Sequence, residues 1–187
     1  LGGMEALDEP YMQIGIVGML KKRAGWLSIL MVSEMFTTSA LQVFDVELAR
    51  LPVLTLFIPL VMSSGGNSGS QATSLITRAM ALKEVQLRDW WRVMHREILS
   101  GLLLGALLGT IGFIRIAVWA SFSTIYGPHW VLVAVTVSFS LVGVVLWGTL
   151  SGSMLPFALK RAGLDPATSS APFVATLVDV TGLVIYF

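Results

Sequence analysis

One aspartate stands inside an apolar stretch of this sequence, where a carboxylate is costly unless something compensates it. Asp179 lies in the run ATLVDVTGLVIYF, whose other residues are apolar, threonine or glycine. An aspartate at the centre of a membrane helix costs about 2.5–3.5 kcal/mol to insert, and such groups usually face water, a cation or a proton path. The basic residue best suited to neutralise Asp179 is Arg115, but we expect it toward the outer end of another apolar segment. Asp179 is therefore a candidate cation ligand; the alternative is a protonated acid bonded to a neighbouring helix.

The second polar feature is the stretch SSGGNSGSQ at residues 63–71, nine residues without a hydrocarbon side chain. Irregular backbone is tolerated at membrane depth only where it lines a watery cavity or is buried in protein. Three glycines loosen a helix, and Pro59 removes a backbone donor shortly before them. We therefore predict a broken helix, whose freed carbonyls are hard ligands suited to Na⁺, Mg²⁺ or Ca²⁺. The alternative is a glycine-hinged kink that caps its own backbone; in a continuous helix, Asn67 and Gln71 would share one face.

A second acidic residue, Glu34, also lies inside an apolar segment. The hydroxyl groups of Ser33, Thr37 and Thr38 stand close to it in the sequence and could serve as hydrogen-bond partners. The residues alone leave two interpretations open for Glu34, a functional carboxylate or a protonated acid bonded to these hydroxyls.

The composition places these residues in a membrane protein. Of the 187 residues, 55% are hydrophobic and only 12% are charged, whereas soluble domains carry about 45–50% apolar and about 25% charged residues. Cysteine is absent, which excludes disulfides and thiolate metal sites. The net charge of +1 carries no sign of nucleic-acid binding. No basic stretch leads directly into an apolar core at the start, so we expect no signal peptide.

Five apolar segments approach the length of about 20 residues that a helix needs to cross a bilayer. They cover residues 26–44, 51–80, 98–122, 130–159 and 169–187, the second holding the polar stretch and the last ending short at the chain end. We therefore predict an all-α membrane protein with five transmembrane helices. Glycines recur in the third segment at spacings of four, four and three, which places them on one face suited to close helix packing: Gly101, Gly105, Gly109 and Gly112.

The basic residues lie between these segments with a strong bias. Ten of the twelve fall on one side of the predicted topology: Lys21, Lys22, Arg23, Arg78, Lys83, Arg88, Arg92, Arg96, Lys160 and Arg161. Only Arg50 and Arg115 fall on the other. Since basic residues concentrate on the cytoplasmic side of membrane proteins, we predict a multi-pass protein of the cell membrane, with a cytoplasmic N-terminus and an outward-facing C-terminus.

The two polar motifs resemble those of a known family. PLVMSSGGNSGSQATSLITRA is similar to the second-helix signature of MgtE magnesium channels, and APFVATLVDVTGLVIYF is similar to their fifth-helix signature. The stretches RDWWRVMHREILSGLLLGALLG and SGSMLPFALKRAGLDPA, and the LDEPY lead-in, also resemble members of that family. The resemblance covers essentially the whole chain.

The resemblance implies a homodimer of five-helix subunits with its ion path on the two-fold axis, lined by the second and fifth helices. It makes Asp179 the main ligand for Mg²⁺. Family positions near that site match Gly66, Asn67 and, through its backbone, Ala175. We further expect four residues of the same two helices to line the pore: Gly65, Ser70, Gln71 and Thr176.

The resemblance also implies cytosolic Mg²⁺-sensing and CBS domains in full-length members, joined to the pore by a linking helix. Residues 1–24 resemble the end of that linking helix, and residues 25–187 form the expected pore domain. Glu5, Asp8 and Glu9 are then possible regulatory contacts to Mg²⁺, or solvated acids without that role.

These observations together predict a Mg²⁺-selective channel that passes a largely hydrated ion down its electrochemical gradient. Mg²⁺ gives up its water reluctantly, so a pore can bind the ion through its water shell. The alternative is a secondary cation–proton exchanger in which Asp179 carries the proton; such transporters often show an internal repeat, and none is visible here. No nucleotide motif or catalytic triad is present, so we expect no enzyme.

Overall fold

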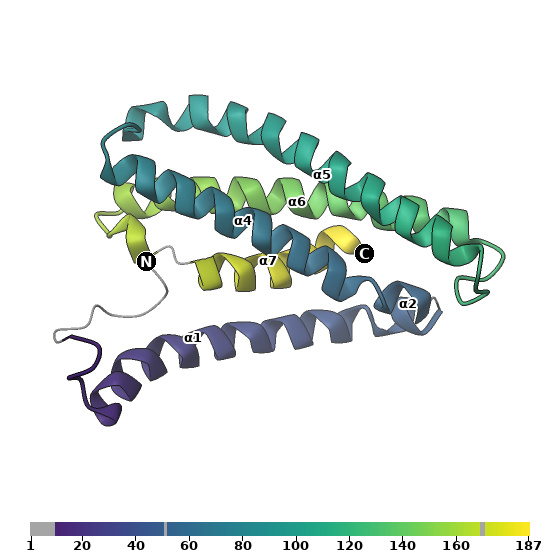
Figure 1. The fold of residues 1–187 in the computed structure, drawn as a ribbon, viewed down its shortest axis with the longest axis horizontal. Helices are drawn as coiled ribbons and strands as arrows, with labels where there is room; N and C mark the ends of the chain where they lie inside the picture. The colour runs from purple at the N-terminus through teal and green to yellow at the C-terminus, as the bar shows by residue number, and fades with distance from the viewer. Residues whose placement is uncertain (1–9, 51, 169–170) are drawn as a thin grey trace.

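All regular structure in the described part of the chain is helical. The computed structural model describes residues 10–50, 52–168 and 171–187, and these ranges contain no strand. The long helices lie side by side, and the chain reverses direction from one to the next (Figure 1). The predicted all-α class is confirmed. In chain order the elements are α1 (Ile16–Val43), α2 (Asp45–Arg50), α3 (Pro52–Thr55), α4 (Ile58–Ala81), η1 (Leu87–Asp89), α5 (Trp90–Ala120), α6 (Trp130–Arg161), η2 (Pro166–Thr168) and α7 (Ala171–Tyr186).

Three stretches of the described chain are long and apolar enough to cross a membrane: α1, α5 together with η1, and α6. α4 has 24 residues, a length of about 36 Å, but its polar stretch keeps it out of this group. α7 is apolar but has only 16 residues, a length of about 24 Å. Crossing by α4 and α7 therefore stays a prediction. The boundary predicted at residue 24 falls inside α1, which is continuous there.

The predicted break in the second segment is wrong. α4 is helical from Ile58 to Ala81 without interruption, so the whole GGNSGSQ stretch belongs to a helix. The irregular backbone lies earlier, at Leu56 and Phe57, between α3 and α4. The carbonyl groups of the stretch therefore remain inside a helix and are not freed as the broken-helix prediction required.

Close packing of α4 on α6 explains the glycines. A Cβ atom at Gly148 or Gly152 on α6 would run into the backbone of Gly65 or Gly69 on α4. Only glycine permits this approach, and small residues at helix contacts are typical of membrane proteins. The hydroxyl of Thr73 donates a hydrogen bond to the carbonyl of Gly152 at 2.8 Å, which ties the same two helices together.

The serines of the polar stretch also find partners inside the protein. Ser68 Oγ and Thr149 Oγ1 lie 2.6 Å apart, joining α4 to α6. Ser64 Oγ donates to the carbonyl of Leu60 on its own helix at 2.7 Å. These residues therefore need no water-filled break, because helix contacts satisfy their hydrogen bonds.

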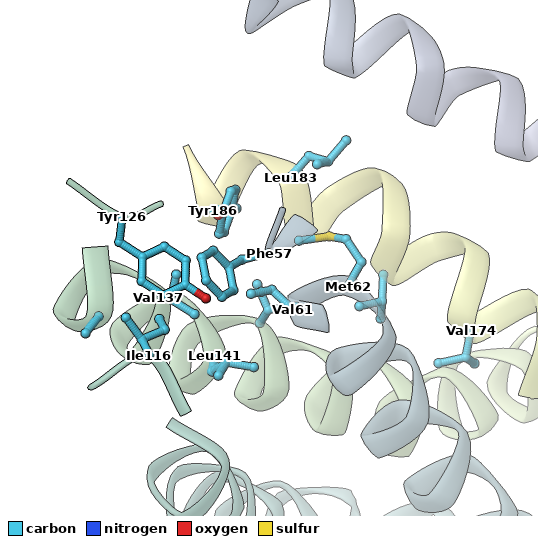
Figure 2. Packing of buried hydrophobic residues seen from close by; sticks show 13 residues of the cluster. Phe57, Val61, Met62, Ile116, Tyr126, Val137, Leu141, Val174, Leu183 and Tyr186 are labelled. Carbon is cyan, nitrogen blue, oxygen red and sulfur yellow. The ribbon is translucent and has the colours of Figure 1, made fainter. Parts of the chain in front are cut away.

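α6 is the central helix and packs on α4, α5 and α7. The predicted glycine face of α5 is confirmed: its four glycines are buried, and a Cβ at Gly105 would lie 2.8 Å from Val142 Cα on α6. The main core joins α4, α6 and α7, and Figure 2 shows Met62 reaching from α4 toward α7. Tyr186 ends α7 in this core, and its hydroxyl donates to the carbonyl of Leu54 at 2.7 Å.

α1 packs on α7 and lies on the opposite side of the bundle from α5 (Figure 1). Two aromatic pairs mark this contact. Trp26 meets Phe173 with ring centroids 6.3 Å apart, and Phe44 stacks on Phe187 with centroids 4.8 Å apart. α1 and α7 therefore run in the same direction, with a contact at each end.

Candidate functional site

A cavity of about 370 Å³ opens where α1, α4 and α7 face one another. Helix α1 contributes Glu34 and Thr37 to its wall. Helix α7 contributes Ala175 and Asp179. The wall from α4 consists of Ile58, Pro59, Met62, Ser63, Gly66 and Asn67. The four residues predicted as metal ligands, Gly66, Asn67, Ala175 and Asp179, are thus brought together around one cavity.

Packing of α7 in the core fixes the position of Asp179. Val174, Val178 and Leu183 are fully buried in the core against α4 and α6. Asp179 and Ala175 are four residues apart, so they lie on one face of the helix, and both line the cavity. The position of α7 is also held by Trp147 Nε1 on α6, which donates to Thr181 Oγ1 at 2.6 Å.

Two residues of α4, Gly66 and Asn67, are the predicted ion ligands that this helix contributes to the cavity wall. A Cβ at Gly66 would lie 3.4 Å from both Cα and Cβ of Ala175, so the two helices already touch there. The missing side chain leaves space beside the carboxylate of Asp179. One residue on, Asn67 is exposed, and its Nδ2 lies 3.5 Å from Ser63 Oγ, at the limit of a hydrogen bond. The amide oxygen of Asn67 is a hard donor of the kind that Mg²⁺ prefers.

The predicted pore-lining residues do not line this cavity. Gly65 is buried, and a Cβ there would meet Val144 and Val178 within 3 Å, so it is a packing residue between helices. Ser70 Oγ donates to the carbonyl of Ala171 at 3.1 Å, and Thr176 Oγ1 donates to that of Pro172 at 3.1 Å. Gln71 is exposed. For Gly65, Ser70, Gln71 and Thr176, pore lining stays a prediction. The possible regulatory acids Glu5, Asp8 and Glu9 lie outside the described residues.

Sequence reasoning left Glu34 undecided and did not include it among the site residues. The structure places it on the same cavity as Asp179. The feature that could have identified Glu34 in the sequence is the one that identified Asp179, a carboxylate within an apolar segment. What the sequence lacked was the pairing of α1 with α7, which brings the two acids to one cavity.

The cavity is lined by oxygen-bearing side chains of the kind that bind Mg²⁺, but there are few of them. They consist of two carboxylates, an amide and hydroxyl groups. No three acidic or histidine side chains cluster as metal ligands anywhere in the ranges that the structure describes. A bare Mg²⁺ requires six oxygens at about 2.0–2.1 Å, so these side chains suit an ion that keeps most of its water.

Comparison with known proteins identifies the family. A family model for MgtE, described as a divalent cation transporter, matches residues 58–187. The chain belongs to this family. It is 41% identical over 186 residues to the magnesium transporter MgtE of Thermus thermophilus and 30% identical over 166 residues to that of Enterococcus faecalis. These alignments cover 100% and 89% of this chain but 39% and 35% of the two relatives, so the chain spans little more than a third of their length.

Membership in the MgtE family confirms the resemblance found in the sequence. The matched region runs from the start of α4 to the end of the chain and contains both polar motifs. The alignment with the Thermus relative also covers α1. With helices able to span a bilayer, membership in a transporter family makes the chain a membrane protein. Its relatives are named as transporters, which is not an enzyme class.

Proposed function

We propose that this protein forms the pore of a Mg²⁺ channel, in which a homodimer passes the largely hydrated ion into the cytoplasm. The observation that carries the proposal is the cavity at Asp179. The carboxylate of Asp179 on α7 and the amide of Asn67 on α4 line this cavity, beside the contact of Gly66 with Ala175. The relatives' name as magnesium transporters supports Mg²⁺ as the cargo.

The volume of the cavity suits a hydrated ion. A water molecule occupies about 30 Å³ in the liquid, so six waters occupy about 180 Å³. That is about half of the 370 Å³ found in one protomer. A bare ion would leave most of this space to solvent and would find too few protein oxygens to replace its shell.

A two-fold dimer would complete the site. One protomer supplies one Asp179, which neutralises only half the charge of Mg²⁺. α6 packs on the other side of α4 and α7, and α5 packs on α6 (Figure 1), so neither helix lines the cavity. A second protomer placed against the face that carries the cavity would add a second Asp179, and the two carboxylates would match the charge of one divalent ion.

The arrangement of charge supports inward flow. The ten predicted cytoplasmic basic residues fall in three segments, residues 21–23, 78–96 and 160–161, at helix ends and links that lie toward one end of the bundle (Figure 1). A divalent ion moving toward that end would gain about 4.6 kcal/mol for each 100 mV of membrane potential, twice the value for one charge. This gradient is sufficient to drive uptake without a chemical fuel.

Electrical recording on the protein in a planar bilayer tests the proposal. We expect discrete unitary currents carried by Mg²⁺, which persist when no pH gradient is present. Mg²⁺ flux that is coupled to proton counterflow and gives no unitary current would instead show an exchanger, with Asp179 as its proton carrier.

A further inference from the structure

Glu34 remains unexplained by the proposed pore, although it shares a cavity with Asp179. It is exposed on α1, a helix of which no described residue is buried within the protomer. An ionised carboxylate in this position would face lipid unless an aqueous space adjoins it, and facing lipid is costly. The cavity between α1, α4 and α7 provides such a space.

The aromatic contacts at both ends of α1 set the level of Glu34 along the bundle. It stands eight residues after Trp26 and ten before Phe44, whose rings contact Phe173 and Phe187 on α7. Asp179 stands six residues after Phe173 and eight before Phe187. Both acids thus lie a little under halfway between the same two contacts. They occupy one level of the bundle and line the same cavity.

No basic side chain that could neutralise Glu34 lies at this level on α1. Arg23, the nearest basic residue on that helix, precedes Glu34 by eleven residues, or about 16 Å along the axis. Arg115 on α5 lies over the ring of Trp119, with its guanidinium carbon 4.1 Å from the centroid. The charge of Glu34 is therefore left to solvent or to a mobile cation.

A second polar residue of α1 lies beside Glu34 on the wall of the cavity. Thr37, one turn beyond Glu34, lines the same wall. Its Oγ1 atom is buried and has no hydrogen-bond partner among the described residues. That atom is closed to solvent, so Thr37 reaches the cavity with its other atoms, and the charged group on the α1 side of the cavity is Glu34.

We propose that Glu34 is a second carboxylate of the ion path, which binds the hydrated cation through its water shell from the α1 side. This inference rests on the proposed function and adds a specificity-determining residue to it. In a dimer, Glu34 and Asp179 together place four negative charges around one level of the pore. A path with that charge favours divalent over monovalent cations, because the attraction to each carboxylate doubles with the charge of the ion.

Neutralising Glu34 tests the proposal in proteoliposomes that contain a Mg²⁺-sensitive dye. For Glu34→Gln we expect the half-saturating Mg²⁺ concentration to rise about 3- to 30-fold, and the preference for Mg²⁺ over K⁺ to fall. Glu84→Gln is the matched control, since Glu84 is an exposed residue of the loop between α4 and η1; it should leave both values unchanged. Asp179→Asn, measured in parallel, should nearly abolish flux.

The outcomes separate the two proposals. Wild-type affinity and selectivity in Glu34→Gln, with flux lost in Asp179→Asn, would overturn the role of Glu34 and leave the pore intact. Unchanged flux in Asp179→Asn would overturn the proposed pore itself.

A thiol experiment decides the question even if Glu34→Gln does not assemble. The chain has no cysteine, so Glu34→Cys provides a single reactive position. A methanethiosulfonate reagent that carries a sulfonate should restore Mg²⁺ affinity to within about threefold of the wild type, whereas one carrying trimethylammonium should depress flux further. Failure of both reagents to react would place residue 34 against lipid and overturn the inference.

Discussion

Replacing Asp179 by asparagine should remove most of the affinity of this protein for Mg²⁺. The change keeps the size of the side chain and most of its hydrogen bonding but deletes the charge. Asp179 lines the cavity and is not one of the buried core residues of α7. The fold should therefore survive, because a neutral amide is cheaper to hold in a membrane than a carboxylate.

The size of the effect follows from the outer-sphere geometry. A carboxylate that contacts a water on Mg²⁺ lies about 5 Å from the metal, from a Mg–O distance of about 2.1 Å and a hydrogen bond of about 2.8 Å. With the dielectric constant of bulk water, the attraction is about 1.7 kcal/mol for each carboxylate. Two carboxylates in a dimer supply about 3.3 kcal/mol, so Asp179→Asn should weaken binding by at least about 200-fold.

Calorimetric titration of Mg²⁺ into the purified dimer measures this loss directly, and dye-loaded proteoliposomes measure the flux. Asp45→Asn makes the same chemical change at an exposed residue of α2, outside the cavity, and should have no effect on either value. Wild-type Mg²⁺ affinity in a folded Asp179→Asn dimer would falsify the assignment of this carboxylate as the ion ligand.

Three further results are expected. If the ion passes with its water shell, the exchange-inert cation [Co(NH₃)₆]³⁺, which carries six fixed ammonia ligands, should compete with Mg²⁺; flux that is insensitive to it would argue for a dehydrated ion. Gly148→Ala should lower the free energy of unfolding by about 1–3 kcal/mol, because its Cβ would meet the backbone of Gly65. Gly25→Ala on α1, where nothing lies within 4 Å, should be neutral or stabilising by up to about 1 kcal/mol, so equal thermal shifts in the two variants would contradict this packing. A single cysteine at Val180, beside Asp179 and partly exposed, should cross-link into dimers only, and a ladder of larger species would exclude a two-fold pore.

The helices could be predicted from the sequence because the apolar runs and residue spacings that indicate a helix are local. α6 begins at Trp130 as predicted, since the apolar run after the GPH turn is long and unambiguous. The spacing of the glycines on α5 likewise predicted its contact face, because four-residue spacing defines one side of a helix. The residues grouped around Asp179 were also identified in advance, but through family resemblance rather than through geometry.

Two features depended on contacts between distant segments, and sequence reasoning failed on both. The GGNSGSQ stretch looks like a break when α4 is considered alone, because glycine and serine are poor helix formers. Opposite it on α6, Gly148 and Gly152 allow its backbone to approach closely, and Thr149 hydrogen-bonds to the hydroxyl of Ser68. Glu34 could not be assigned for the same reason, since its partner helix, α7, follows it by more than a hundred residues.

The continuity of α4 changes which groups can recognise the ion. A broken helix would have offered free carbonyls, which strip water from a cation as they do in K⁺-selective filters. In α4 those carbonyls lie in a regular helix, and the groups left to line the cavity are an amide and one hydroxyl on α4 with carboxylates on α1 and α7. Such groups accept hydrogen bonds from the water around an ion more readily than they replace it, because Mg²⁺ demands a near-ideal octahedron that they cannot supply. Selectivity would then come from charge and from the width of a cavity set by the contact of Gly66 with Ala175, where the helices already touch. A larger residue at Gly66 should therefore block Mg²⁺ flux into dye-loaded proteoliposomes while leaving the charge of the site unchanged.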